Sequence, residues 1–329
     1  MDEAKIKPLL QLARLYEEYS KLQNWHREPY DLYSPVNYIM GQQGKKLRPL
    51  SLLFIFQLFK DSVQDAMHAA YALELFHNFT LMHDDIMDQA ELRRGQDTTY
   101  KKFGLSAAIL SGDVMLIDSF SYLQKTESLQ IKNEIMDDFI KTSREICEGQ
   151  SMDMSFEKKT AITLEEYLEM IRLKTAVLLA CALKMGAKLA NQSNEICNQF
   201  YALGIQLGLA FQVQDDWLDF YGNEIKVGKT RAGDVLQCKK SALILLATAA
   251  IEEEERIQIL QEYHTKTNDE DKIKKFEEIF TKYQVENRIS NLFNDYQQKI
   301  NVLIKDLKLS LAQELALNDF VKIILNRTS

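Results

Sequence analysis

Cysteine is scarce in this chain, with four residues among 329. No two of them form a CxxC pair, and so few thiols favour reduced, unpaired cysteines over a disulfide framework or a structural zinc site. The N-terminal residues MDEAKIKPLL lack the apolar core of a signal peptide. Together these absences indicate a cytoplasmic protein.

Helix-breaking residues are also scarce. All four prolines lie at or before Pro49, and no glycine occurs from Asp234 to the C-terminus. Strands and hairpins need turn residues at short intervals, whereas apolar residues here recur at helical spacing. The sequence therefore predicts an all-α fold. No linker or repeat divides it, so we expect one domain over residues 1–329, with the charged stretch Thr265–Lys275 as a solvated connection between helices.

Neither a basic surface nor a long hydrophobic run is present. The net charge of −8 argues against general affinity for nucleic acid or anionic membranes. The longest uncharged run, Ile196–Gln214, contains too many amide side chains for a bilayer span and is interpreted as a buried helix. Any phosphate-binding function must therefore depend on a focused site.

Two aspartate clusters supply such a site, and both have the pattern DDxxD. Members one helical turn apart share a helix face, where like charges destabilise the helix unless something compensates them. Mg²⁺ is a natural partner, because it is commonly held by one or two carboxylates plus substrate phosphates. A single cluster is equally well explained as a solvated acidic face, but two clusters in apolar surroundings favour metal binding. The predicted metal ligands are Asp84, Asp85 and Asp88 in LMHDDIMDQ, and Asp215, Asp216 and Asp219 in FQVQDDWLDF.

Basic residues accompany both aspartate clusters along the chain. Lys45 and Arg48 are three residues apart in GKKLRP, and Arg93 and Arg94 follow the first aspartate cluster. Each alone would be an ordinary surface cation. Beside two metal-binding clusters, they indicate sites for diphosphate groups. Further along the chain come Lys174, Lys229, Lys239 and Lys240.

In the order of these motifs the sequence resembles the trans-isoprenyl diphosphate synthases, the polyprenyl synthetase family that includes farnesyl and geranylgeranyl diphosphate synthases. The resemblance covers roughly Gly41 to Lys240. It rests on GKKLRP, on the first cluster running into LRRG, on Lys174-Thr175 and on the second cluster. The sequence departs from the family at Asp97, where a proline is usual, and at Cys238, where glycine is common.

The resemblance implies a helical bundle around a central cavity, as in the isoprenoid synthase fold. It also implies a Mg²⁺-dependent prenyltransferase that condenses isopentenyl diphosphate head-to-tail with dimethylallyl, geranyl or farnesyl diphosphate and releases diphosphate. About three Mg²⁺ ions per active site are expected, with Asp84 and Asp88 holding two and Asp215 the third. A homodimer without nucleic-acid partners or stable membrane insertion is expected as well.

The resemblance assigns roles to the remaining polar residues. One group neutralises the allylic diphosphate, a second holds isopentenyl diphosphate, and a third stabilises the allylic carbocation through oxygen dipoles. The residues that neutralise the allylic diphosphate are Arg93, Lys174 and Lys229. Isopentenyl diphosphate is held by Lys45, Arg48, His77 and Arg94, and the carbocation is stabilised by Thr175 and Gln212. Lys239 is a further predicted substrate-binding residue.

Product length is predicted from the residues before Asp84. Phe79 stands five positions before it and Thr80 four, a combination that resembles geranylgeranyl (C20) synthases, with farnesyl (C15) as the alternative. Two other functions remain open. A class I terpene cyclase usually has an Asn/Ser/Glu metal motif as its second cluster and does not need Lys45 and Arg48, and a non-catalytic helical partner subunit would not need the acidic and basic groups found here.

Overall fold

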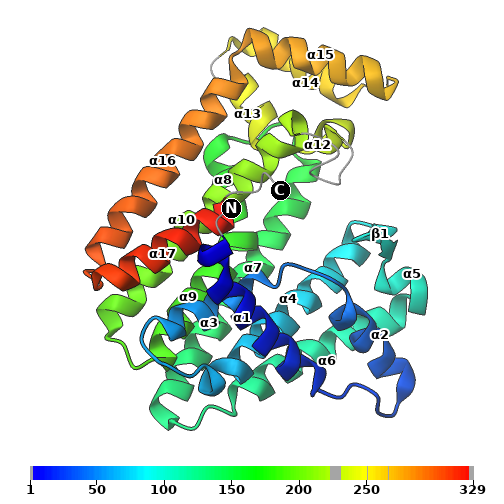
Figure 1. Ribbon diagram of the computed structural model, residues 1–329. Helices are drawn as coiled ribbons and strands as arrows, with labels where there is room; N and C mark the ends of the chain where they lie inside the picture. The colour runs from blue at the N-terminus through cyan, green and yellow to red at the C-terminus, as the bar shows by residue number, and fades with distance from the viewer. Residues whose placement is uncertain (1–2, 223–230, 250, 266, 326–329) are drawn as a thin grey trace. The chain divides into compact units, whose positions relative to one another are not determined.

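The described chain is almost entirely helical, which confirms the predicted all-α class (Figure 1). The computed structural model describes residues 3–222, 231–249, 251–265 and 267–325. The chain separates into two compact units, residues 1–140 with 181–200 and residues 141–180 with 201–329, which are taken in turn. The single-domain prediction stays a prediction. None of the described helices combines the length and apolar character that a membrane span needs.

The first unit is built around helix α4 (Met67–Met87), which is buried on almost every side. Helices that are apolar all round are found inside protein cores. α4 approaches α6 (Leu105–Leu123) so closely at Gly112 that an added Cβ would lie 2.2 Å from His83 Nε2. The other elements with residues in this unit are α1 (Glu3–Lys21), α2 (Tyr30–Gly41), α3 (Leu47–Gln57), a 3₁₀ turn (Gln64–Ala66), α5 (Thr99–Phe103), the start of α7 (Leu129–Lys158), the end of α9 (Val177–Leu189) and the start of α10 (Asn194–Tyr221).

A small hairpin follows α4. Strand β1 (Leu92–Arg93) pairs antiparallel with β2 (Gln96–Asp97), and Arg93 lies opposite Gln96. The loop residues Arg94 and Gly95 have φ values of 53° and 74°. Positive φ at both central residues is the signature of a type I′ turn, whose twist matches the strands it joins. The hairpin therefore holds two consecutive arginines in a defined backbone conformation.

The second unit contains the rest of α7, α9 and α10. Gly204 and Gly208 let α10 lie against the chain at Ala176 and Ala180, because an added Cβ would come within 2.5 Å of their Cα atoms. The uncharged run interpreted as a buried helix lies within α10, as predicted. The remaining elements are α8 (Leu164–Ile171), a π-helical turn η2 (Arg172–Ala176), α12 (Gly233–Leu236), α13 (Ala242–Thr248), α14 (Glu253–His264), α15 (Asp269–Lys282), α16 (Val285–Asp306) and α17 (Leu311–Leu325).

The charged stretch from residue 265 to 275 is not a simple connection. Helix α15 begins at Asp269, so that interpretation was wrong for residues 269–275. The side chain of Asn268 accepts a hydrogen bond of 2.9 Å from the Asp271 amide, and three acidic residues occupy the first turn. Both features favour a helix N-terminus. Charge alone was therefore a poor guide to where the helix starts.

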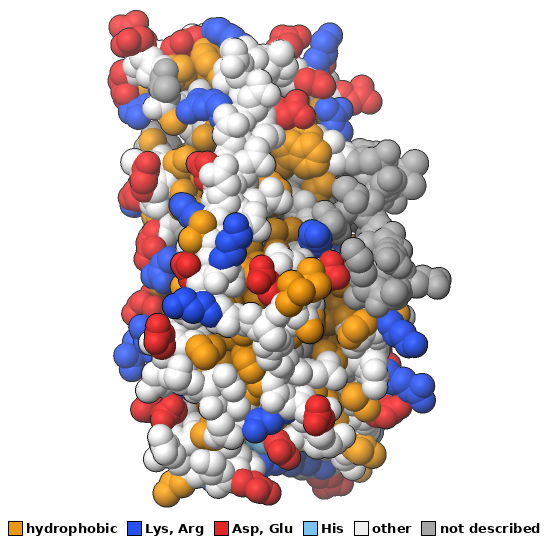
Figure 2. Space-filling view, turned by 60° about the vertical axis from the view of Figure 1, so that its left-hand side comes forward, with side chains coloured by type: hydrophobic (Ala, Val, Ile, Leu, Met, Phe, Trp, Pro, Cys, Tyr) orange, Lys and Arg blue, Asp and Glu red, His pale blue; other side chains and the backbone are white. Residues whose placement is uncertain are grey.

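The surface carries both signs of charge. On the face drawn in Figure 2, acidic and basic side chains of the described residues are interspersed with apolar ones. No broad field of one sign is visible among the coloured side chains on that face. This distribution agrees with the expectation that phosphate binding here depends on local groups.

Candidate active site

The first aspartate cluster lies at the C-terminal end of α4. Asp84 is half-buried, and Asp88 is the exposed residue that ends the helix one turn later. Asp85 is only 2% exposed and forms a two-pronged ion pair with Arg93, at 2.9 Å from Nε and 2.7 Å from Nη2 to Oδ1. A predicted metal ligand and a predicted diphosphate-binding residue are thus partners of each other. Within the described ranges, no three His, Cys, Asp or Glu residues are gathered as a metal site.

Arg94 points elsewhere, although it follows Arg93 directly. Its guanidinium lies over Gly44, where an added Cβ would be 2.9 Å from the Arg94 Cζ and Nη1 atoms. Gly44 precedes the exposed Lys45. The hairpin therefore sends Arg93 to the aspartate cluster and brings Arg94 to the GKKLRP segment, so that two predicted isopentenyl diphosphate residues are neighbours.

The same basic group includes Arg48 and His77, whose Nη1 and Nε2 atoms are 3.0 Å apart. Burial, and then the nearby Arg48 and Arg94, hold the pKa of His77 well below its usual value, so the imidazole is neutral. Burial also lowers the pKa of Arg48 to about 10, and the Glu74 carboxylate opposes this shift. The guanidinium therefore stays charged near neutral pH.

Glu74 is a residue of this group that the sequence interpretation missed. It is 1% exposed, and its Oε1 accepts bonds of 3.0 Å from Lys46 Nζ and 2.9 Å from Asn78 Nδ2. A buried carboxylate requires such partners. Its position one helical turn before His77 was the available signal, because residues three apart share a helix face.

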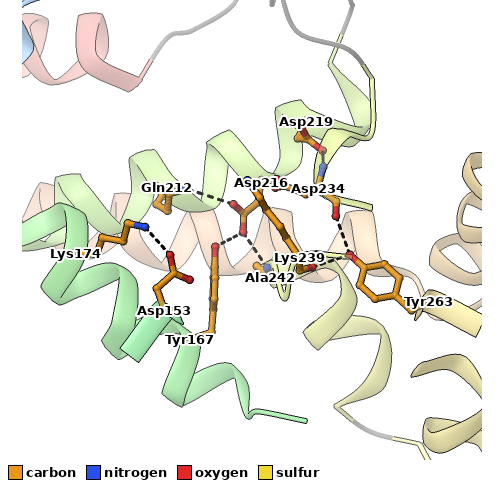
Figure 3. A network of polar contacts seen from close by, with 10 residues as sticks. All are labelled: Asp153, Tyr167, Lys174, Gln212, Asp216, Asp219, Asp234, Lys239, Ala242 and Tyr263. Atoms are coloured by element: carbon orange, nitrogen blue, oxygen red, sulfur yellow. Dashed lines mark hydrogen bonds and ion pairs between the residues drawn. The ribbon is translucent and has the colours of Figure 1, made fainter. Parts of the chain in front are cut away.

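In the second unit, Lys174 lies in the π-helical turn and pairs with Asp153 at 2.5 Å (Figure 3). Gly149 makes this arrangement possible, because an added Cβ would lie 2.4 Å from the Lys174 amide nitrogen. Such π turns are often found at functional sites. The half-buried Thr175 follows in the same turn.

The second aspartate cluster lies near the end of α10. Asp216 is 3% exposed, and its Oδ2 accepts hydrogen bonds from the Tyr167 hydroxyl at 2.6 Å and the Ala242 amide at 2.9 Å (Figure 3). Gln212 Nε2 lies 3.4 Å from the other oxygen. Burial raises the pKa of Asp216 to about 7, although the Tyr167 and Ala242 hydrogen bonds lower it. Asp215, by contrast, is half-buried.

The third member, Asp219, is tied to the chain that follows. Its Oδ2 accepts a bond of 3.0 Å from the Asp234 amide. Asp234 in turn lies 3.8 Å from Lys239 Nζ. Lys240 donates to the Phe156 carbonyl at 2.7 Å. Lys229, a predicted diphosphate-binding residue, lies outside the described residues.

The two predicted chain-length residues lie on α4 in the first unit. The Phe79 ring is 9% exposed and contacts the rings of Phe76 and His83, with centroids 5.4 Å and 4.8 Å away. The half-buried Thr80 donates its hydroxyl to the His77 carbonyl at 2.8 Å. Phe79 thus belongs to an aromatic row on the helix that ends in the first aspartate cluster.

Comparison with known proteins gives a consistent family. The family model for polyprenyl synthetase matches residues 29–280. The chain is 40% identical over 220 residues to a geranylgeranyl diphosphate synthase of Methanosarcina mazei, covering 67% of this chain and 68% of that protein. It is 36% identical over 238 residues to a geranylfarnesyl diphosphate synthase of Natronomonas pharaonis, covering 67% and 70%.

A solved structure agrees over nearly the whole length. The crystal structure of a geranylgeranyl pyrophosphate synthase is 35% identical, with a TM-score of 0.90 and coverage of 98% of this chain and 99% of that one. The family match spans both aspartate clusters and the basic segments described above. The chain is therefore a prenyltransferase of the polyprenyl synthetase family.

Proposed function

We propose that this protein elongates allylic diphosphates by head-to-tail condensation with isopentenyl diphosphate, and that diphosphate is released. The observation that carries the proposal is the basic group of the first unit. Arg48 and Arg94 surround a neutral His77, beside Lys45 and Lys46, and Glu74 is the buried carboxylate among them. This surplus of positive charge suits isopentenyl diphosphate, whose diphosphate group is bound without metal and stays attached during the condensation.

Magnesium suits the carboxylates of Asp84, Asp88 and Asp215, which are less buried than Asp85 and Asp216. Asp84 and Asp88 are oxygen donors one turn apart, and Asp215 is a half-buried oxygen donor on α10. Mg²⁺ prefers such ligands, few in number and combined with substrate phosphates. When bound, the ions would neutralise the charge that develops on the leaving diphosphate. The contacts of Asp85 and Asp216 support roles for these two carboxylates in orienting Arg93, Gln212 and the surrounding chain.

The chain's own residues support both ionisation and the carbocation that it forms. Lys174, held by Asp153, supplies a fixed positive charge for the allylic diphosphate. Gln212 and Thr175 offer oxygen dipoles without a nucleophilic charge, which suits a carbocation. The released diphosphate is the base for the final proton loss.

We infer a C20 product, geranylgeranyl diphosphate, with the C15 product as the alternative. Relatives named geranylgeranyl diphosphate synthase support the longer product, as does the single aromatic residue Phe79 beside the small Thr80. The protein is also proposed to act as a cytoplasmic homodimer. Four exposed apolar side chains of α6 support the dimer, because Leu105, Ile109, Leu110 and Ile117 are each at least 41% exposed.

The direct test is turnover of isopentenyl diphosphate with each allylic primer and Mg²⁺, with products identified by mass spectrometry. We expect C20 diphosphate from the wild type. We expect Asp84→Ala to remain helical and to lose activity by about 10²- to 10³-fold, the scale seen when one transition-state contact is removed.

Lys45→Ala should raise the apparent KM for isopentenyl diphosphate more than that for the allylic substrate. A cyclised hydrocarbon product, or a fully active Asp84→Ala protein, would contradict the proposal.

A further inference from the structure

The residues after Lys240 carry no recognisable motif, yet one of them holds the segment that follows the second aspartate cluster. Tyr263, on α14, donates its hydroxyl to the Lys239 carbonyl at 2.6 Å, and the Asp234 carbonyl lies 3.2 Å from the same hydroxyl (Figure 3). The Cys238 thiol donates back to the Tyr263 carbonyl at 3.1 Å. The segment from Asp234 to Lys239 is therefore held by one residue at both of its ends and at Cys238, beside its C-terminal end.

Tyr263 is itself rigidly placed. It is 1% exposed, and its ring packs edge-on against Phe276 of α15, with centroids 5.0 Å apart. Lys272, 7% exposed, lies 5.4 Å from the same ring and donates to the Cys238 sulfur at 3.0 Å. Burial raises the pKa of Tyr263 well above its usual value, and the Asp234 carboxylate adds to this shift, so the hydroxyl keeps the proton that it donates.

The segment from Asp234 to Lys239 supplies two charged groups of the candidate site and contacts a third, Asp219. The Asp234 amide donates to the Asp219 carboxylate at 3.0 Å, and Lys239 Nζ lies 3.8 Å from the Asp234 carboxylate. Cys238 has a φ of 55°, a left-handed conformation that costs free energy for a residue other than glycine and persists only where surrounding contacts impose it. The backbone hydrogen bonds that end α12, from Lys239 N to the Asp234 carbonyl at 2.9 Å and from Cys238 N to the Val235 carbonyl at 3.1 Å, form the helix C-terminal motif that uses this conformation. The contacts of Tyr263 and Lys272 with Cys238 hold this turn against α14 and α15.

We propose that Tyr263 is a positioning residue of the second aspartate cluster, which fixes the backbone of Asp234–Lys239 so that Asp219, Asp234 and Lys239 present their charges to the allylic diphosphate and its metal. The inference rests on the proposed prenyl transfer. It assigns a functional part to α14 and α15. The competing explanation is that Tyr263 is a core side chain whose ring alone matters.

Tyr263→Phe separates the two explanations, because it removes the hydroxyl and keeps the ring. Both carbonyls retain backbone partners, Lys239 N on Asp234 and Ser241 N on Lys239, each at 2.9 Å, so we expect a folded protein. Loss of one such hydrogen bond should raise the apparent KM for the allylic substrate and the Mg²⁺ concentration for half-maximal rate by about five- to tenfold. The KM for isopentenyl diphosphate should stay unchanged. Without any ligand, amide hydrogen exchange should accelerate in residues 233–241.

Tyr283→Phe is the matched control. Tyr283 is a half-buried tyrosine of the same region whose hydroxyl donates to the Glu255 carboxylate, so its removal should change neither the KM values nor exchange in residues 233–241. Equal effects of Tyr263→Phe on both substrates, unchanged exchange, or a Tyr263→Phe protein that does not fold would each overturn the positioning role. An inactive wild type would instead overturn the proposed prenyl transfer, and the exchange experiment would still decide whether Tyr263 holds the segment.

Discussion

At the scale of single residues, the three aspartates of the second cluster differ sharply in environment. Asp216 accepts hydrogen bonds from Tyr167 and from the Ala242 amide, Asp219 accepts one from the Asp234 amide, and Asp215 is half-buried beside them. A buried donor that loses its acceptor costs about 1–3 kcal/mol. The same motif therefore combines one buried carboxylate, Asp216, which two donors of the chain engage, with two half-buried carboxylates, Asp215 and Asp219.

This difference in burial predicts different free energies of unfolding for two alanine variants. Asp216→Ala should lower the free energy of unfolding by about 1–3 kcal/mol, because the Tyr167 hydroxyl and the Ala242 amide lose their acceptor. Asp215→Ala should leave that free energy unchanged or slightly raised, because it removes a like charge from α10, while activity falls. Urea denaturation followed by circular dichroism measures both. Equal stabilities of the two variants would show that the hydrogen bonds of Asp216 carry no net weight.

Phe79 supports a prediction about product length. Its ring lies one turn before the first aspartate cluster, among Phe76 and His83. If the growing chain ends against this ring, Phe79→Ala should shift the products towards longer chains, and Thr80→Phe should shorten them. Mass spectrometry of the products from each variant is the measurement. An unchanged product distribution in both would place the end of the chain elsewhere, with Phe76 or Met115 as the next candidates.

The sequence predicted some of these roles and not others, for a physical reason. The spacing of Asp84 and Asp88 along a helix is a local property, so their shared face could be predicted. The different directions of the Arg93 and Arg94 side chains depend on positive φ at Arg94 and Gly95. Of these two residues, only the glycine suggests that conformation in the sequence. The pairing of Asp85 with Arg93 joins two residues eight positions apart across the end of α4, and helical spacing does not predict it.

At the scale of elements, the π-helical turn η2 is held against α7 by close backbone contact. At Gly149 a Cβ would lie 2.4 Å from the Lys174 nitrogen and 2.8 Å from the Leu173 carbonyl carbon. Both neighbours are backbone atoms, which cannot turn aside as a side chain can. The position of Lys174 and Thr175 therefore depends on residue 149 of α7 being a glycine, which has no side chain.

Gly149→Ala should accordingly lower both stability and activity. Overpacking of this kind typically costs about 1–3 kcal/mol, and any relaxation must shift the turn that carries Lys174. Gly41→Ala is the control, because no heavy atom lies within 4 Å of a Cβ built at Gly41. Thermal melting and steady-state kinetics of the two variants give the comparison. A Gly149→Ala protein as stable and active as Gly41→Ala would mean that α7 and η2 separate at little cost.

Helix existence was predictable from the scarcity of glycine and proline, whereas helix irregularity was not. The π turn inserts an extra residue between α8 and α9 without any proline or glycine from Arg172 to Ala176. The turn lies against Gly149, which is on another helix. The start of α15 was missed in a different way, because its charged residues were interpreted as solvent-exposed loop when Asn268 in fact caps a helix.

At the scale of the whole molecule, much of the site depends on residues far from any motif. Tyr263 contacts Lys239 and Asp234 from a separate helix, and no local pattern distinguishes it from the many other tyrosines of the chain. The motifs recognised in the sequence end near Lys240, so they offered no reason to assign Tyr263 a part. Contacts between distant segments are set by tertiary packing, which single-sequence patterns do not encode.

The outward face of α6 supports the last prediction, which concerns assembly. Leu105, Ile109, Leu110 and Ile117 are 53%, 41%, 57% and 63% exposed, and at 100° per residue all four lie on one side of the helix. Exposed Asp113 and Ser106 lie among them on the same side. Several exposed apolar side chains on one side of a helix favour a protein–protein contact, and we propose a second copy of the chain as the partner that covers them.

The wild type should therefore be dimeric in analytical ultracentrifugation. The double substitution Ile109→Glu with Ile117→Glu should give monomers, because two carboxylates per subunit would be desolvated in the contact. Leu22→Glu serves as the control, since Leu22 is 80% exposed and lies outside this face. A monomeric wild type, or a double variant that stays dimeric, would show that α6 is not the interface. If the monomeric variant also loses prenyl transfer while its helical content is retained, assembly is required for the activity itself.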